Sequence, residues 1–254
     1  MADPILLLYS VVNVVVTALF AGIVLRQYLQ RHRPYQLYWS IALTMAFLAT
    51  LAYVFMVVVQ PTSGPGVLLF RLYYILGAAL MAAWLGLGSI ALVSSTRVTR
   101  ISLIILCVLS LLAIVLISTA NIDMSKLSHI AGTPGADILQ PALGAWLVTI
   151  IILNTLGVLA VGGVAVYSGW KLMRRQASVA GFHTMNLLWA NVLILVGDLL
   201  LGAAGTSARL GIKNIFWLIM AMGWIVLFSG VLLTSRRSAK TKPIVQDQLV
   251  HTGQ

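Results

Sequence analysis

The chain has 254 residues, of which 61% are hydrophobic and only 8% are charged, and its mean hydropathy is +1.03. A soluble domain carries roughly 25% charged residues, so this composition excludes an ordinary soluble fold and predicts an integral membrane protein in a lipid bilayer. The net charge of +11 would suggest a nucleic-acid partner in a soluble protein, but the basic residues gather in loops on one side, and we expect no nucleic acid.

Apolar runs of about 20 residues recur along the chain, separated by short polar segments. Lipid leaves backbone polar groups without water, so the spans must be helices or a closed barrel, and runs that are apolar on all sides favour helices. We predict an all-α polytopic bundle of seven transmembrane helices over residues 1–234, followed by a basic, disordered cytoplasmic tail over 235–254. The predicted spans cover residues 4–25, 38–59, 67–93, 101–119, 145–167, 184–204 and 215–234.

Two connections stand out in this order. The segment Gln60–Gly66 is a cluster of turn-forming residues and predicts a firm break between the second and third spans. Residues 120–144 form the longest loop, which we interpret as a connector with room for a surface lid.

The basic residues are distributed very unevenly between the two sides of the predicted bundle. Three lie on one side, namely Lys126, Arg209 and Lys213, and twelve lie on the side of the tail. Because short cytoplasmic loops are enriched in lysine and arginine, this asymmetry predicts a multi-pass protein with its N-terminus outside and its C-terminus in the cytoplasm. The first span lacks a basic segment before it, so we expect it to stay uncleaved.

The first and fifth spans share a spacing. Asn13 and Asn154 are each followed by a glycine nine residues on and by an arginine twenty residues on. Two parallel three-helix units joined by the fourth span would give a 3+1+3 repeat, as in some transporters. The layout resembles the SWEET sugar transporters and, more distantly, microbial rhodopsins. Any two apolar spans that end in arginine can be aligned somewhere, so the repeat is left open.

The motif search mainly excludes functions. No lysine lies at mid-membrane, which argues against a retinal Schiff base, and no histidines have a spacing suited to zinc or haem. The one cysteine, Cys107, lies in an apolar run. We therefore expect no catalytic residues, no metal and no cofactor, and we expect that the protein is not an enzyme.

Two ionisable residues lie within the predicted spans, and such residues are costly in lipid and often functional. Arg71 lies about four residues from the outer end of the third span and Asp198 about six from that of the sixth. Their opposite charges and similar depths predict an ion pair or ligand site, joined by Tyr73, Tyr74 and Asn191. The alternative is that Arg71 extends to the headgroups and that Asp198 binds polar neighbours.

Small residues at helical spacing predict close helix packing. One face of the third span carries Ala78, Ala82 and Gly86, and the sixth span carries Gly202 and Gly205 on the side of Asp198. A modest polar cavity, or else hydrogen bonds between helices, is expected from a further group of polar residues in the spans: Asn13, Thr17, Thr44 and Asn154.

The segments FRLYYILGA (70–78), WLGLG (84–88) and GDLLLGAAG (197–205) together resemble a set of uncharacterised bacterial seven-span membrane proteins. This resemblance implies a bacterial cytoplasmic (inner) membrane and no particular activity.

Two function hypotheses remain. The protein is a non-enzymatic subunit or scaffold, held through its small-residue faces to other membrane subunits or to copies of itself. Alternatively, it is a small-molecule transporter or sensor with an outer-side site near Arg71 and Asp198. A cavity lined by these residues would favour the second hypothesis, and a solid bundle with an exposed small-residue stripe would favour the first.

Overall fold

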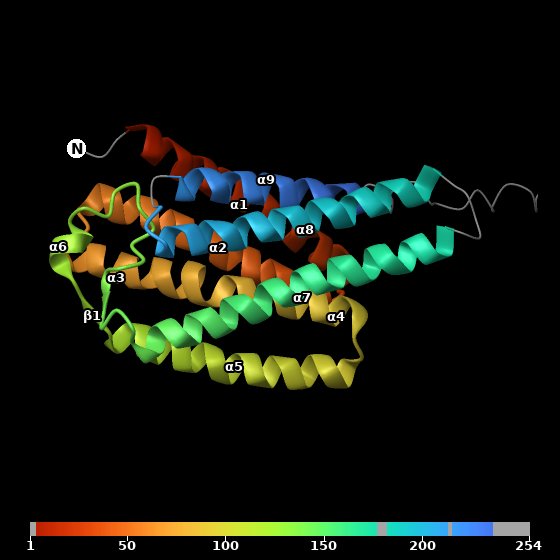
Figure 1. The fold of residues 1–254 in the computed structure, drawn as a ribbon, viewed down its shortest axis with the longest axis horizontal. Coiled ribbons are helices and arrows are strands. Elements are labelled where there is room, and N and C mark those ends of the chain that lie inside the picture. Colours follow the sequence, from red (N-terminus) through yellow and green to blue (C-terminus); the bar gives the residue numbers. More distant parts are fainter. Residues whose placement is uncertain (1–3, 177–181, 213–214, 236–254) are drawn as a thin grey trace, which may run out of the picture.

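The computed structural model describes residues 4–176, 182–212 and 215–235, and most of them are helical (Figure 1). Seven segments of this described part are long and apolar enough to cross a bilayer, which confirms the predicted all-α membrane bundle. The elements are α1 (Pro4–Arg31), α2 (Pro34–Val59), α3 (Gly64–Tyr73), the π-helix η1 (Tyr74–Leu80), α4 (Met81–Val93), α5 (Thr96–Thr119), β1 (Asn121–Ile122), α6 (Met124–Leu127), β2 (Leu139–Gln140), α7 (Ala145–Gln176), α8 (Phe182–Arg209) and α9 (Phe216–Ser235). The predicted tail lies outside the described residues from position 236 onward.

Most helices are longer than the predicted spans. Helix α1 continues to Arg31, and α8 continues to Arg209, five residues past the predicted end at 204. Apolar runs mark only the part of a helix that lies in hydrocarbon, whereas the backbone hydrogen bonds continue into the headgroup layer, where long basic side chains reach water. The length of the apolar run therefore underestimates the helix.

The predicted turn between the second and third spans is shorter than expected. Helix α3 begins at Gly64, because Ser63 accepts a hydrogen bond from the amide of Gly66 and Pro65 occupies the first turn, where its missing N–H costs nothing. A Cβ atom at Gly66 would lie 2.2 Å from the carbonyl oxygen of Gln60, so the tight entry to this helix requires glycine.

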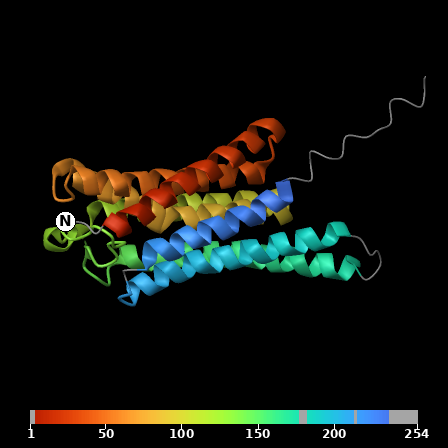
Figure 2. The ribbon, with the colours of Figure 1, turned by 90° about the horizontal axis from the view of Figure 1, so that it is seen from above.

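Six of the spans form a closed ring in which neighbours follow chain order. Helix α1 packs on α2, α2 on the α3–η1–α4 span, α4 on α7, α7 on α8, α8 on α9, and α9 returns to α1. Figure 2 shows α1 and α2 on one side of the molecule and α7 and α8 on the other. Helix α5 lies outside the ring against α4, η1 and α7. The ring brings the two predicted three-helix units side by side, and the repeat itself stays a prediction.

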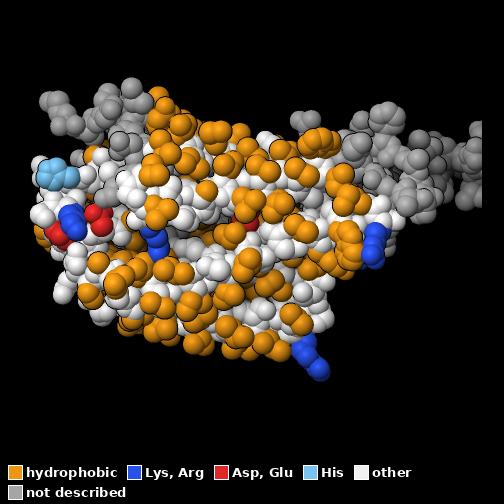
Figure 3. All heavy atoms as spheres, viewed as in Figure 1, with side chains coloured by type: hydrophobic (Ala, Val, Ile, Leu, Met, Phe, Trp, Pro, Cys, Tyr) orange, Lys and Arg blue, Asp and Glu red, His pale blue; other side chains and the backbone are white. Residues whose placement is uncertain are grey.

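The surface is that of a protein in lipid. Large hydrophobic side chains are exposed along the helices. On α5, for example, Ile104, Val108 and Leu111 each have more than 60% of their surface exposed. Figure 3 shows hydrophobic side chains over the middle of one face, with lysine and arginine side chains toward its two ends. A bilayer is the environment that satisfies such a surface.

Residues 120–144 are a folded cap and not an open connector. Strands β1 and β2 pair antiparallel, and Ile130, Ile138 and Leu139 are almost completely buried. Tyr53 of α2 donates to the carbonyl of Ile130 and accepts from the amide of Gly132, so the cap is bonded to the bundle. We call the end of the bundle that carries this cap the loop end.

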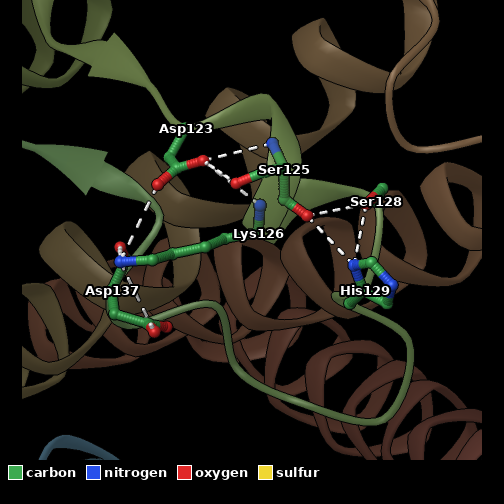
Figure 4. Close-up of polar contacts among 6 residues, drawn as sticks. All are labelled: Asp123, Ser125, Lys126, Ser128, His129 and Asp137. Atoms are coloured by element: carbon green, nitrogen blue, oxygen red, sulfur yellow. Dashed lines mark hydrogen bonds and ion pairs between the residues drawn. The ribbon is translucent and has the colours of Figure 1, made fainter.

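A polar cluster holds the exposed side of the cap together (Figure 4). Asp123 caps the N-terminus of α6 by accepting from the amides of Ser125 and Lys126. The ammonium nitrogen of Lys126 lies 3.8 Å from Asp123 and 4.0 Å from Asp137, and it thereby links α6 to the turn that precedes β2. The Ser125 hydroxyl also donates to Asp123, and this bond is the main reason that the pKa of that carboxyl is lowered.

Candidate functional site

A cavity of about 250 Å³ lies inside the ring, in the half of the bundle nearest the loop end. It is bounded by α2, η1, α4, α7, α8 and α9, and Pro134 and Ala136 of the cap also line it. Its lining contains three of the predicted site residues, Asp198, Tyr73 and Tyr74, which the fold brings together from α3, η1 and α8. The bundle is therefore not solid.

Asp198 is the charged group in the deep part of this cavity. Only 4% of its surface is exposed, and its Oδ2 atom has no hydrogen-bond partner among the described residues. The backbone of Gly162 in α7 is close enough to interact with the carboxylate, but its amide already donates within α7 and makes no hydrogen bond of regular geometry to Oδ2. A buried carboxylate oxygen without a donor is costly, so this position requires a reason beyond packing.

Helix α8 places Asp198 near the middle of its candidate membrane span, Leu188–Arg209. Its last residue, Arg209, lies eleven positions farther on, about 16 Å along the helix axis. Eleven residues make slightly more than three turns of an α-helix, so the two charged side chains share one face of α8. Arg209 is exposed and lines the cavity at the loop end. Its charge acts on Tyr74 there, and so does the charge of Asp137 in the cap.

Aromatic rings form much of the remaining wall. Tyr73, Tyr74, Trp217 and Trp224 line the cavity, and the rings of Tyr73 and Trp217 have centroids 6.2 Å apart. The hydroxyl of Tyr73 donates to the carbonyl of Pro134, which fixes the ring under the cap. Tyr73, Tyr74 and Trp217 belong to one buried hydrophobic cluster, and Trp224 belongs to a second, in which its ring packs against Phe20 of α1.

The π-helix shapes the wall between α2 and α7. At its end, the amide of Met81 donates to the carbonyl of Leu76, five residues back, so the helix is wider here than an α-helix. Where such a segment returns to α-geometry, a carbonyl loses its regular donor. The side-chain amide of Asn154 on α7 donates to the carbonyl of Ala78 at 2.8 Å. Asn154 lines the cavity as predicted, and it also supports the π-helix that forms it.

Small residues leave the space that the cavity occupies. The prediction that Gly205 is a packing residue is wrong, because a Cβ there would meet nothing within 4 Å, whereas a Cβ at Gly202 would be in ordinary contact with Val158 of α7 at 3.6 Å. Both glycines line the cavity. Ala78 and Ala82 line it too, and Ala82 additionally contacts α7.

The close helix crossings lie elsewhere. A Cβ at Gly86 would lie 2.9 Å from the Cα of Gly157, so the prediction for Gly86 is confirmed, with α7 as its partner. Helices α8 and α9 approach at Gly197 and Gly223, which sequence reasoning missed. Their apolar neighbours give no signal that distinguishes a packing glycine from a cavity glycine.

The predicted pair of Arg71 and Asp198 is wrong. Arg71 donates from its guanidinium to the carbonyls of Ile117, at 2.6 Å, of Ser118, and of Ala120, at 3.1 Å. These carbonyls end α5, which itself supplies no donors for them, and a cation is favourable at a helix C-terminus. Arg71 lies seven residues from the start of α3, about 10 Å along its axis, so its depth also differs from that of Asp198.

The other predicted polar residues separate into two groups. Asn13 donates to the carbonyls of Tyr9 and Trp217, and Thr17 lies 3.4 Å from the hydroxyl of Thr50, so these residues hold α1 to its neighbours and do not line the cavity. Asn191 is half-buried near Gly169, and Thr44 is half-buried, both outside the cavity lining. Thr50, which sequence reasoning missed, does line it.

The cavity reaches the surface between two helices. Ile151 and Thr155 on α7, and Gly205 and Thr206 on α8, line it and are exposed. At the loop end the folded cap covers it through Pro134 and Ala136. The opening therefore faces the side of the bundle, where lipid would lie, more than the water beyond the cap.

Comparisons with protein-family models, curated proteins and solved structures find no match to this chain. The site is therefore argued from its own chemistry. Within the described ranges, no group of three or more histidine, cysteine or acidic residues is placed to hold a metal ion. What the arrangement offers is one buried carboxylate, several aromatic faces and a small apolar volume.

Proposed function

We propose that the protein is a non-enzymatic membrane protein that binds a small molecule within the bilayer, as a transporter or a sensor. The observation that carries the proposal is the carboxylate of Asp198, which is buried in a cavity and has an oxygen without a donor in the described part of the chain. Intramembrane acids that face a cavity are typical of substrate and ion pathways.

A scaffold role is less well supported by the packing. That hypothesis rests on small-residue faces that would bind partner subunits. The face that includes Ala82 and Gly86 is occupied by α7 of the same chain, and Gly202 and Gly205 line the cavity. The small-residue faces predicted from the sequence are therefore used within the bundle and are not free for a partner.

The position of the opening supports a ligand that dissolves in lipid. With the basic residues concentrated at the opposite end, the loop end faces the outside, and the opening between α7 and α8 lies in the outer leaflet. The cap separates the cavity from the outer solution. We propose that the ligand partitions into the outer leaflet and enters sideways between these helices.

The test uses a variant that fills the cavity. Gly205→Leu puts a side chain into open space, and Gly163→Leu is its matched control, because Gly163 also lies on a helix, is also exposed and has no neighbour within 4 Å of a Cβ. Neither substitution clashes at Cβ, and both replace a poor helix former with a good one.

Wild type and both variants are extracted from the native membrane into polymer nanodiscs, and the bound small molecules are identified by native mass spectrometry. We expect a molecule that is retained by wild type and Gly163→Leu and lost from Gly205→Leu. Identical sets of bound molecules in all three proteins would contradict a functional cavity.

A further inference from the structure

The chemistry of the cavity wall narrows the class of ligand, if the proposed function holds. A carboxylate within a membrane needs a compensating positive charge or a proton, because hydrocarbon solvates an isolated charge very poorly. Arg71 does not supply that charge, since it is bonded to the end of α5. Arg209 lies near the cap, about 16 Å along α8 from Asp198.

The aromatic residues point to the same kind of partner. Faces of tryptophan and tyrosine attract cations, and a ring of such faces is a known way to hold an ammonium group. Trp224 lines the cavity at a depth similar to that of Asp198, since its neighbour Gly223 packs against Leu201, whereas Tyr73, Tyr74 and Trp217 line the cavity toward the cap. Carboxylate and aromatic faces combined are selective for an organic ammonium over an anion or a neutral molecule.

A metal ion fits the site poorly. Divalent cations require several oxygen or nitrogen ligands, and the described residues provide a single acid here without a second acidic, histidine or cysteine neighbour. Much of the rest of the wall is built from small and apolar side chains such as Ala46, Met81 and Leu201, and its other polar members are Thr50, Asn154, Thr155, Thr206 and, at the loop end, Arg209. The apolar side chains would favour an apolar body attached to the charged group.

We infer that the ligand is a compact lipophilic amine, whose ammonium group pairs with the carboxylate of Asp198 and whose apolar body fills the space beside Gly202 and Gly205. The inference rests on the proposed function, but it makes a separate claim about charge. A volume of about 250 Å³ suits a body of roughly ten carbon atoms.

The test uses three probes with one apolar body: 1-adamantanamine, 1-adamantanol and adamantane-1-carboxylic acid. Binding of each is measured by isothermal titration calorimetry at pH 7 to the full-length protein in nanodiscs of zwitterionic lipid, with empty nanodiscs as the blank. We expect the amine to bind about tenfold more tightly than the alcohol, and the acid to bind more weakly than both.

Two variants locate the effect. Asp198→Asn should weaken binding of the amine about tenfold and change binding of the alcohol by no more than about twofold, because the substitution removes the negative charge and keeps the shape of the side chain. Gly205→Leu should abolish binding of both probes, and Gly163→Leu should change neither. The comparison of amine with alcohol on wild type does not depend on any variant, and it decides the question even if Asp198→Asn fails to fold.

The outcomes separate the two proposals. Equal binding of amine and alcohol, both lost in Gly205→Leu, would overturn the ammonium assignment and leave the ligand cavity standing, with Asp198 then protonated. Binding that Gly205→Leu does not affect, or no binding of any probe, would overturn the ammonium assignment. If Gly205→Leu also retains every native ligand, the proposed function fails with it.

Discussion

The guanidinium of Arg71 lies where α5 ends, among backbone carbonyls that the helix leaves without amide donors. This is a structural role for a charged residue within a span. Asp198, in contrast, lines a cavity, and its Oδ2 atom accepts no hydrogen bond from the described residues. At the scale of residues, the two charges therefore act independently, and this independence can be measured.

Replacing Arg71 should destabilise the outer half of α5. We expect Arg71→Leu to lower the free energy of unfolding by roughly 1–3 kcal/mol, because charge-assisted bonds to three carbonyls are lost. Arg100→Leu, at an exposed position near the start of α5, should have little effect. Unfolding by steric trapping in bicelles gives the free energies.

The same unfolding assay tests whether Arg71 and Asp198 form an ion pair. In the double variant Arg71→Leu with Asp198→Leu, we expect the two changes in free energy to add within about 0.5 kcal/mol, as they do for groups that share no partner. A double variant more stable than the sum of the single changes would restore a contact between the two residues.

The cap responds to acid through Asp123. The hydroxyl of Ser125, followed by the amide of Lys126, lowers the pKa of this exposed carboxyl below its ordinary value of 3.8. A lowered pKa in the folded state means that the stabilisation is complete above the unfolded pKa and is lost as the pH falls through the folded one. We expect the hydrogen-exchange protection of the Ser125 and Lys126 amides to fall in this acid range. Asp123→Asn should remove the pH dependence, and an unchanged profile in that variant would contradict the mechanism.

At the scale of elements, glycines allow the closest helix crossings and also leave the space that the cavity occupies. A Cβ at Gly157 would lie 2.4 Å from the backbone of Ala82, so α4 and α7 cross there almost in backbone contact. The π-helix in the same span widens the wall a turn away, and Asn154 of α7 donates to it. Helix α7 thus sets both the tightest contact and the shape of the cavity.

Gly157→Ala tests the crossing. The added methyl group must push α4 away from α7, and we expect the free energy of unfolding to fall by roughly 1–3 kcal/mol, as it does for overpacked cores. Gly163→Ala on the same helix has open space around it and should be neutral or slightly stabilising. Thermal unfolding in detergent, followed by circular dichroism, compares the two. Equal melting temperatures would mean that the helices are not in close contact.

Asn154→Leu tests the support of the π-helix. It removes the donor to the buried carbonyl of Ala78 while keeping the size of the side chain, and we expect a cost of roughly 1–3 kcal/mol. Thr155→Val, one position along, removes a hydroxyl that is exposed and should cost much less. A loss no larger than that of Thr155→Val would show that the carbonyl finds another donor.

At the scale of the whole molecule, six helices close a ring and α5 supports it from outside. A closed ring can hold a cavity because no helix occupies its centre, and the folded cap covers the loop end. Which end faces the outside follows from the distribution of basic residues and stays a prediction.

Cysteine labelling tests that orientation. In a Cys107→Ala background, His129→Cys places a thiol on the exposed side of the cap, and Thr96→Cys places one at the exposed first residue of α5, at the other end of the bundle. An impermeant maleimide added to intact cells should label His129→Cys, and it should label Thr96→Cys only after permeabilisation. The reverse pattern would invert the topology.

The sequence by itself determined the number of spans and most of their positions, because the free energy of inserting a helix depends on the apolar length of a local segment. It also marked Asp198, Tyr73, Tyr74 and Asn154, because polar groups in hydrocarbon must have a partner or a function. What such a pattern lacks is the rotation of each helix against its neighbours.

Only the tertiary structure decided which partner each group has. Arg71 bonds to α5 and not to Asp198, because α5 packs beside η1 and ends at that depth. Gly86 meets Gly157 closely while Gly205 borders open space, although both are glycines on apolar faces. Contacts between helices are formed by residues far apart in the chain, so a local pattern of small residues indicates that backbones can approach but not where they do.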